Sequence, residues 1–277
     1  MTLLSSGVRN NLFTLASNMS MMETVGERIA TGKRVNSASD DPYAYFTSKN
    51  LTTKATNIDF VTSQYDIGSS TIQNSINALD AMDGLFEQAE ALAMAAADGS
   101  SSAAERAGYE ASYIDILNQV EDFANSAGFQ GTNLLAGGDL SVTTEAGTSV
   151  GSTSVDYTAV ANIEGGLTTD AATLDWDNAT DATGQANATA TLANIQAART
   201  QVQAQQGIYA NDQFIMETRK DFAESVQNLY LDEVSNLTDA DPTEEAANLT
   251  ALQTRAQLAQ NTLALLMQQQ QGVLSLF

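Results

Sequence analysis

The stretch LTALQTRAQLAQNTLALL, residues 249–266, carries small and apolar side chains at alternating intervals of three and four residues. That spacing places them on one side of an α-helix and is the heptad pattern of a coiled coil. The stripe consists of Leu249, Leu252, Ala256, Ala259, Leu263 and Leu266. A helix with such a stripe needs a partner helix to cover it.

The N-terminal segment carries a second stripe of the same kind, made of Leu4, Val8, Leu12, Leu15, Met19, Met22 and Ile29. We expect the two terminal helices to pair in antiparallel fashion, with both chain ends at one extremity. Periodicity alone leaves an alternative open, in which each helix packs on a globular core. The apolar residues at the end of the chain favour a contact with another subunit, because termini are normally polar. These are Val273, Leu274, Leu276 and Phe277.

Proline and glycine mark the boundaries of the other elements. Pro42 and Pro242 each follow an aspartate, which predicts two helix starts capped by Asp41 and Asp241, with Glu244 completing a capping box at the second. We expect a linker over 32–41, helix to about residue 127 with a break at 98–102, and helix again from about 192 to 231. The glycine-punctuated segment 136–191 is rich in Ser and Thr and predicts a small β-hairpin region. The predicted fold is mainly α, an elongated antiparallel helical bundle or coiled coil formed by the N- and C-terminal segments.

Composition excludes several classes of function. The chain has no Cys and no His, which removes thiolate nucleophiles and the usual ligands of zinc, haem and iron–sulfur clusters, so we expect no metal and no cofactor. A net charge of −23 argues against a nucleic-acid partner, and residues 55–198 hold Arg106 as their only basic residue. The acidic surface indicates solubility of an abundant protein or adaptation to a saline medium. We expect neither a cleaved leader nor a membrane span.

Three separated motifs now resemble one family. Residues 27–42, ERIATGKRVNSASDDP, resemble the N-terminal signature of bacterial flagellins, which links the innermost helix to the outer-core helix. Residues 129–135, FQGTNLL, resemble the turn ahead of the family's β-hairpin, with Gln130 in place of the usual Asn. The C-terminal helix, 246–277, resembles that of the family, and the short central segment is typical of compact flagellins.

The resemblance implies a secreted structural subunit that leaves the cell unfolded through a type III apparatus and polymerises with itself into the filament used for swimming. It also implies an export chaperone and cap and junction proteins as partners. The alternative within the family is the hook–filament junction protein, and from another class a coiled-coil or adhesin module that forms no polymer. Recognition by a Toll-like receptor is not expected, because Gln88 and Glu90 replace both arginines of the segment that the receptor reads.

We predict an inner-core coiled coil with its linker at 1–41 and 237–277, an outer-core bundle at 42–135 and 192–236, and a variable surface segment at 136–191. The terminal stripes and the apolar tail are the predicted subunit contacts. A second predicted site is the joint between the two layers, whose cations would pair with acids of an adjacent subunit and set the lattice register. It comprises Arg28, Lys33, Arg34, Asn36, Asp40 and Asp41. We predict no catalytic residue, since the paired acids already serve as helix caps and first-turn acids.

Overall fold

The computed structural model describes residues 6–136, 140–142, 153–155, 167 and 171–274. Its helices are α1 (Ser6–Thr31), α2 (Pro42–Ala97), α3 (Ala103–Ser126), α5 (Ala171–Leu174), α6 (Asp181–Thr238) and α7 (Pro242–Leu274). The chain forms two compact units, one of Met1–Thr56 with Gln227–Phe277 and one of Asn57–Val226. We call them the terminal unit and the central unit. The predicted mainly α fold, built of antiparallel helices from both ends of the sequence, is confirmed.

The helix boundaries follow local capping chemistry. The Asp41 carboxylate accepts a hydrogen bond from the Ala44 backbone N–H at 3.0 Å, and the Asp241 carboxylate accepts one from the Thr243 N–H at 2.8 Å. Both predicted helix starts at proline are therefore correct. α1 ends at Thr31 and is followed by Gly32, whose φ of +69° is a left-handed conformation that glycine adopts without strain. The predicted break at 98–102 lies between α2 and α3, where Ser102 and Glu105 form a capping box.

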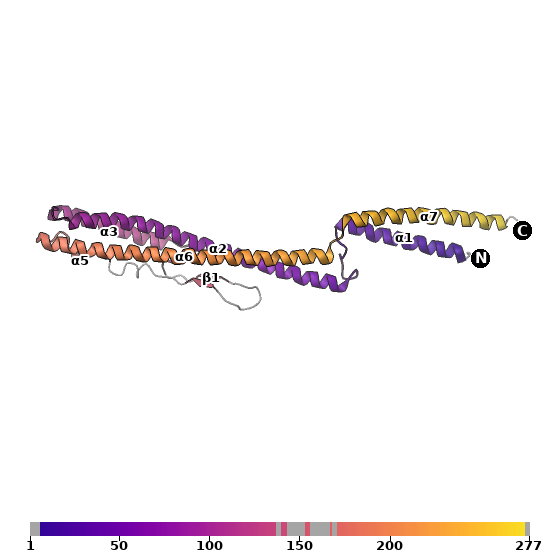
Figure 1. The fold of residues 1–277 in the computed structure, drawn as a ribbon, viewed down its shortest axis with the longest axis horizontal. Helices are drawn as coiled ribbons and strands as arrows, with labels where there is room; N and C mark the ends of the chain where they lie inside the picture. The colour runs from indigo at the N-terminus through magenta and orange to yellow at the C-terminus, as the bar shows by residue number, and fades with distance from the viewer. Residues whose placement is uncertain (1–5, 137–139, 143–152, 156–166, 168–170, 275–277) are drawn as a thin grey trace. The chain divides into compact units, whose positions relative to one another are not determined.

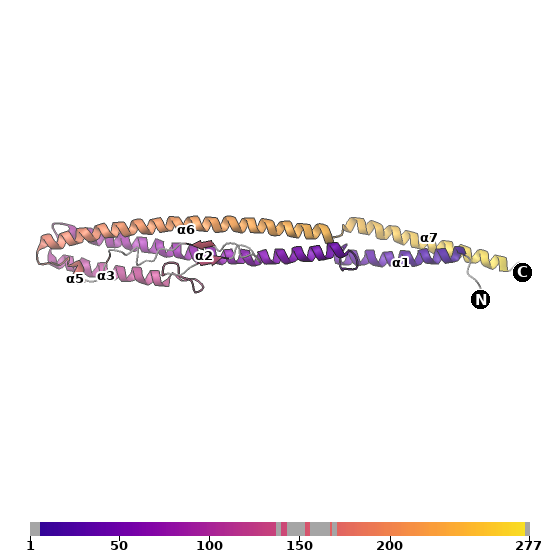
Figure 2. The same cartoon turned by 90° about the horizontal axis from the view of Figure 1, so that it is seen from below.

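The central unit is a bundle in which α2, α3 and α6 lie side by side (Figures 1 and 2). Each of these helices contributes fully buried side chains to one core, such as Phe86, Tyr113 and Tyr209. α2 and α6 run antiparallel, and Arg199 of α6 bonds two carboxylates of α2. Its Nε lies 3.1 Å from Asp83 Oδ1 and its Nη1 lies 2.7 Å from Glu90 Oε2. This ion cluster fixes the register of the two long helices.

The segment between α3 and α6 differs from the prediction. β1 (Leu140–Val142) and β2 (Thr153–Val155) pair antiparallel, with Ser141 opposite Ser154, and most of the predicted hairpin region lies outside the described residues. α6 begins at Asp181, not near residue 192, and ends at Thr238, not near 231. The Ser and Thr content suggested strand, but in a helix these hydroxyls bond the carbonyl one turn back. Thr189 and Thr191 do so, to Gln185 and Asn187.

A tight turn after α3 carries an unfavourable residue. Phe129 and Thr132 exchange two backbone hydrogen bonds of 2.8 and 2.9 Å across Gln130 and Gly131. Both central residues have positive φ, +47° for Gln130 and +87° for Gly131. This is the geometry that Asn-Gly satisfies best, because Asn tolerates the left-handed region better than Gln does.

We expect Gln130→Asn to stabilise the central unit by about 0.5–1 kcal/mol, because it removes part of the strain of a left-handed residue. The measurement is the free energy of unfolding from denaturant titration. Gln130→Ala is the control, since alanine has no local hydrogen bond to favour the left-handed region and should not stabilise. Equal stability of both variants would show that the turn is unstrained.

Candidate assembly interface

The terminal unit is built on the antiparallel pair of α1 and α7, which lie side by side in both ribbon views (Figures 1 and 2). A Cβ on Gly7 would lie 4.0 Å from Leu266 Cδ1, and Arg28 Nη1 lies 3.2 Å from Glu245 Oε1, so the start of one helix faces the end of the other. The predicted α7 stripe is buried or half-buried at every position, and Glu245 extends it by one turn.

The stripe on α1 is rotated from the one predicted. Val8, Leu15 and Met22 are buried or half-buried as expected, but Leu12 and Met19 are 40% and 57% exposed, and Ile29 is exposed as well. The inner positions between them are filled by Asn11, Asn18 and Val25. The predicted and the observed stripe of α1 share Val8, Leu15 and Met22. They differ at the positions between these residues, where the more apolar side chains are the exposed ones. The observed side ends on Val25, whereas the expected side meets Gly26, which has no side chain to bury.

Polar groups weaken this contact within one chain. The Asn11 Nδ2 group is buried without a hydrogen-bond partner, and Asn18 is 6% exposed. A buried polar group left unpaired costs about 1–3 kcal/mol. Polar residues inside a coiled-coil seam also restrict which register and partner it accepts. The seam is thus specific in register but less stable than a wholly apolar one.

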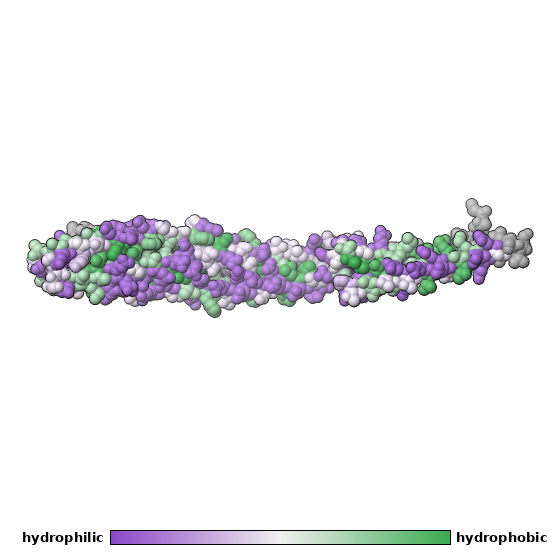
Figure 3. Space-filling view, turned by 90° about the horizontal axis from the view of Figure 1, so that it is seen from above, coloured by the Kyte–Doolittle hydropathy of each residue, from purple (hydrophilic) through white to green (hydrophobic). Residues whose placement is uncertain are grey.

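Large apolar side chains remain uncovered on both helices. α1 exposes Leu12, Phe13, Met19 and Met21, and α7 exposes Leu258, Leu265 and Met267. The space-filling view shows apolar patches that interrupt the hydrophilic surface (Figure 3). Large apolar side chains left exposed on paired helices are typical of surfaces that contact further chains. Leu4, Leu276, Phe277 and the side chain of Val273 lie outside the described residues.

The joint between α1 and α2 is held by bonds within the chain. The Arg34 backbone N–H donates to Thr238 O at 2.7 Å, and its guanidinium Nη2 donates to Leu237 O at 3.2 Å. Arg28 pairs with Glu245 of the same chain, so the partner that we expected from an adjacent subunit is supplied internally. Lys33 contributes a backbone bridge to Asp239, and its exposed ammonium has no ion pair among the described residues.

Asp40 organises the linker of this joint. Its Oδ2 accepts hydrogen bonds from the backbone N–H groups of Asn36 and Ser37 at 3.0 and 2.8 Å, and Asn36 Nδ2 donates to Glu27 Oε1. The backbone N–H of Ser37, followed by that of Asn36 and the Ser37 hydroxyl, holds the pKa of Asp40 below its ordinary value of 3.8. The charged carboxylate is therefore the form that fixes this turn.

We expect Asp40→Asn to raise hydrogen exchange at the amides of Asn36 and Ser37 in assembled protein at pH 7. A carboxyl whose folded pKa is lowered stabilises above its unfolded value, and this stabilisation disappears as the pH falls through the folded pKa, below 3.8. Protection in the linker of the unchanged protein should follow that titration. Asp232→Asn, at an exposed position of α6, is the control, and equal exchange in both variants would contradict the assignment.

The candidate site is a set of exposed apolar side chains on two paired helices. Among the described residues no group of acidic side chains could hold a metal ion, and no helix in this part of the chain is long and apolar enough to cross a membrane. The model of the bacterial flagellin N-terminal helical region matches residues 7–139, and that of the C-terminal helical region matches residues 192–277, well over half of the chain together. The chain belongs to the bacterial flagellin family.

Relatives extend along nearly the whole chain. Flagellin FljK of Caulobacter vibrioides is 27% identical over 273 residues, which cover 99% of this chain and 97% of the relative. Flagellin FljO of the same bacterium is 28% identical over 279 residues with the same coverage. The crystal structure of Bacillus cereus flagellin, at 15% identity and a TM-score of 0.47, covers 58% of this chain and 86% of that one.

Membership of the family defines the general role. Flagellins are structural proteins, so the prediction that the chain is not an enzyme is confirmed. The chain is a subunit that polymerises with copies of itself into an extracellular flagellar filament. The apolar side chains left exposed on α1 and α7 are the kind of surface that such a polymer requires.

Proposed function

We propose that this chain forms the body of a filament that serves swimming, and not the hook–filament junction. The observation that carries the proposal is the exposed apolar surface on α1 and α7, since two helices cannot cover it and repeated copies can. The Caulobacter proteins that align along 99% of the chain are themselves named flagellins, which supports the filament over the junction.

The filament would be layered as the sequence indicates. Residues 1–41 and 237–277 would form the inner layer, 42–135 and 192–236 the outer layer, and 136–191 the outer surface. Leu12 and Met19, left out of the seam within one chain, would pack on neighbouring subunits. Lys33 is the joint cation with no ion pair among the described residues, and it would pair with an acid of the next subunit to set the register.

Secretion would proceed through a type III apparatus with an export chaperone, and cap and junction proteins would meet the two ends of the filament. Export in an unfolded state requires terminal helices that are only marginally stable alone. The unpaired Asn11 amide in the α1–α7 seam fits that requirement. Burial of the exposed stripes on assembly would then offset the entropy of ordering them.

Electron microscopy of the purified full-length protein tests the proposal. We expect long filaments from the chain alone, and none after removal of residues 249–277, while circular dichroism still reports a helical body. A strain lacking its own flagellins should regain swimming with the full-length chain. Short assemblies that do not elongate would support the junction role, and filaments from the truncated chain would refute the assignment of the seam.

A further inference from the structure

Methionine thioethers are the only sulfur groups of the chain, which has eight Met and no Cys. Three of them lie exposed on the terminal unit: Met19 at 57% and Met21 at 47% on α1, and Met267 at 51% on α7. Met82 and Met216, by contrast, are fully buried in the core of the central unit. The terminal helices thus present oxidisable side chains to solvent in a single copy of the chain.

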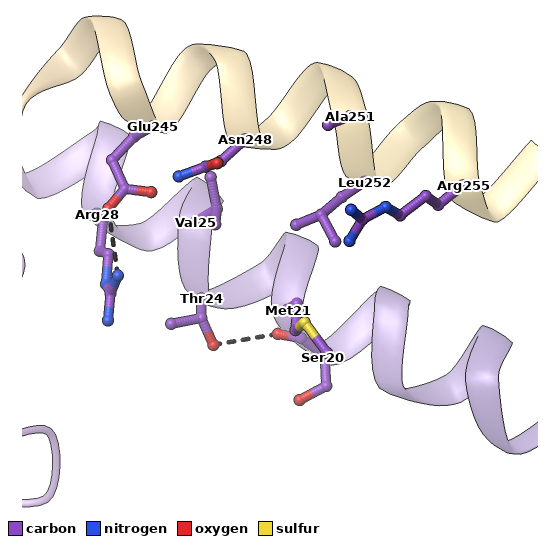
Figure 4. Close-up of a pocket in the computed structure, with 10 residues that line it drawn as sticks. All are labelled: Ser20, Met21, Thr24, Val25, Arg28, Glu245, Asn248, Ala251, Leu252 and Arg255. Atoms are coloured by element: carbon purple, nitrogen blue, oxygen red, sulfur yellow. Dashed lines mark hydrogen bonds and ion pairs between the residues drawn. The ribbon is translucent and has the colours of Figure 1, made fainter.

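The three exposed methionines belong to the apolar surface that we assign to assembly. Met21 lines a groove of about 410 Å³ between α1 and α7, together with Val25 and Leu252 (Figure 4). Met19 follows Leu12 by one heptad, and both are exposed on the same side of α1. Two paired helices leave these side chains in water, so contact with further copies is what would bury them. Their surroundings therefore differ between the free subunit and the filament.

We propose that Met19, Met21 and Met267 make filament growth sensitive to oxidation. A peroxide converts their thioethers to sulfoxides in the free subunit, and an oxidised subunit does not join the filament. Assembly buries the thioethers of an unoxidised subunit and protects them from the same oxidant. The inference rests on the proposed filament and adds a chemical control over which subunits enter it.

The reaction balances with hydrogen peroxide as the oxidant. The thioether sulfur attacks one peroxide oxygen, a new S–O bond forms and the O–O bond breaks. The sulfur loses two electrons to the peroxide, and the departing oxygen takes up both hydrogens and leaves as water. The product is methionine sulfoxide, which methionine sulfoxide reductases convert back to the thioether. No cysteine of this chain competes for the oxidant.

The new oxygen explains the expected loss of assembly. Methionine is flexible and apolar and fills irregular contacts well, whereas its sulfoxide carries a polar oxygen that accepts hydrogen bonds. Burial of that oxygen without a donor should weaken subunit addition by about tenfold or more for each site. Met82 and Met216 lie in a core that excludes the peroxide, so the central unit keeps its fold during the reaction.

Seeded filament growth after peroxide treatment of the full-length free subunit tests the proposal. We expect growth to slow by about tenfold or more and to recover after treatment with methionine sulfoxide reductases. The triple variant Met19→Leu, Met21→Leu, Met267→Leu keeps the apolar surface without a sulfur and should grow equally before and after peroxide. The matched control, Met82→Leu with Met216→Leu, keeps the exposed sulfurs and should slow as the unchanged chain does.

A mixed pool of the unchanged chain locates the effect at individual positions. Filaments grown from partly oxidised subunits should hold about tenfold less sulfoxide at positions 19, 21 and 267 than the subunits left in solution, as measured by peptide mass spectrometry. Intact filaments exposed to peroxide should gain sulfoxide at these positions more slowly than free subunits by a similar factor. Because it needs no variant, this measurement decides the question even for a triple variant that does not assemble.

The outcomes separate this proposal from the filament itself. Equal sulfoxide in filaments and in the remaining pool would overturn the oxidation proposal and leave the filament proposal standing. A triple variant that slows after peroxide as much as the unchanged chain would do the same. It retains Met94, which is 57% exposed on α2, and would place the sensitivity at another methionine. Failure of the untreated chain to form filaments would overturn both.

Discussion

Replacement of Arg106 by methionine is expected to destabilise the central unit by about 2–5 kcal/mol, because buried backbone carbonyls lose their guanidinium donors. The Arg106 side chain is fully buried and its guanidinium makes four hydrogen bonds. Nε donates to Trp176 O at 2.7 Å, Nη1 to Ser101 O at 2.6 Å, and Nη2 to Asp181 Oδ1 at 2.8 Å and to Asn178 O at 3.4 Å. The arginine therefore joins the start of α3 to the loop before α6.

Methionine keeps the apolar stem of the side chain but ends near the position of Nε, so the loss reports the polar contacts together with the space that the guanidinium leaves. The carbonyls of Ser101 and Trp176 would lose their guanidinium donors, at about 1–3 kcal/mol for each group left buried. Asp181→Asn is the matched control, since its side chain is 68% exposed and the amide oxygen still accepts a hydrogen bond. We expect that control to cost less than about 1 kcal/mol.

Denaturant unfolding followed by circular dichroism measures both variants. The loss of stability in Arg106→Lys should lie between those of the other two variants. Lysine retains the positive charge, but its single ammonium group cannot bond all the acceptors that the planar guanidinium reaches. A stability of Arg106→Met within about 1 kcal/mol of the unchanged chain would mean that water replaces the guanidinium without loss.

The elements predicted correctly are those encoded by neighbouring residues. The α7 stripe, the proline starts at 42 and 242 and the break before α3 each depend on spacing or capping within about one turn of helix. The rotated stripe on α1 could not be decided in that way. Val8, Leu15 and Met22 belong to both possible faces, and the choice depends on how the side chains of α7 fit against each.

Arg106 illustrates what a sequence cannot encode locally. Its isolation as the only basic residue among 55–198 was visible and could have suggested a buried role. Its acceptors, however, include the backbone carbonyls of Trp176 and Asn178, about 70 positions away. Every residue has a backbone carbonyl, so residue identity does not indicate which carbonyls accept from Arg106. The early start of α6 was missed for a related reason, since Asp181 is fixed by Arg106 from another helix.

Gly184 is expected to be the least replaceable glycine among those that the structure describes. It lies in the first turns of α6, where an added Cβ would collide with the Trp176 carbonyl oxygen and lie 2.9 Å from Arg106 Nε. The Trp176 backbone cannot move aside as a flexible side chain can, because its carbonyl oxygen accepts a hydrogen bond of 2.7 Å from Arg106 Nε. Gly184→Ala should therefore destabilise by about 2–3 kcal/mol, as overpacking in a dense core does.

The control lies in the same helix. A Cβ on Gly207 meets no atom within 4 Å, so Gly207→Ala gains helix propensity without a clash and should stabilise by about 0.5–1 kcal/mol. Opposite signs for one substitution at two positions of α6 separate close packing from propensity. If Gly184→Ala also stabilised, the close approach of α6 to the Trp176 loop would be refuted.

Combining Gly184→Ala with Arg106→Met tests whether both act on the same contact. Each change disturbs the bond between Arg106 Nε and Trp176 O, so the second change has less left to remove. Residues that share a partner are not additive, and we expect the double variant to lose at least about 1 kcal/mol less than the sum of the two single losses. Gly207→Ala combined with Arg106→Met should be additive, because position 207 touches neither group. Additivity in both pairs would mean that the glycine and the arginine stabilise the chain independently.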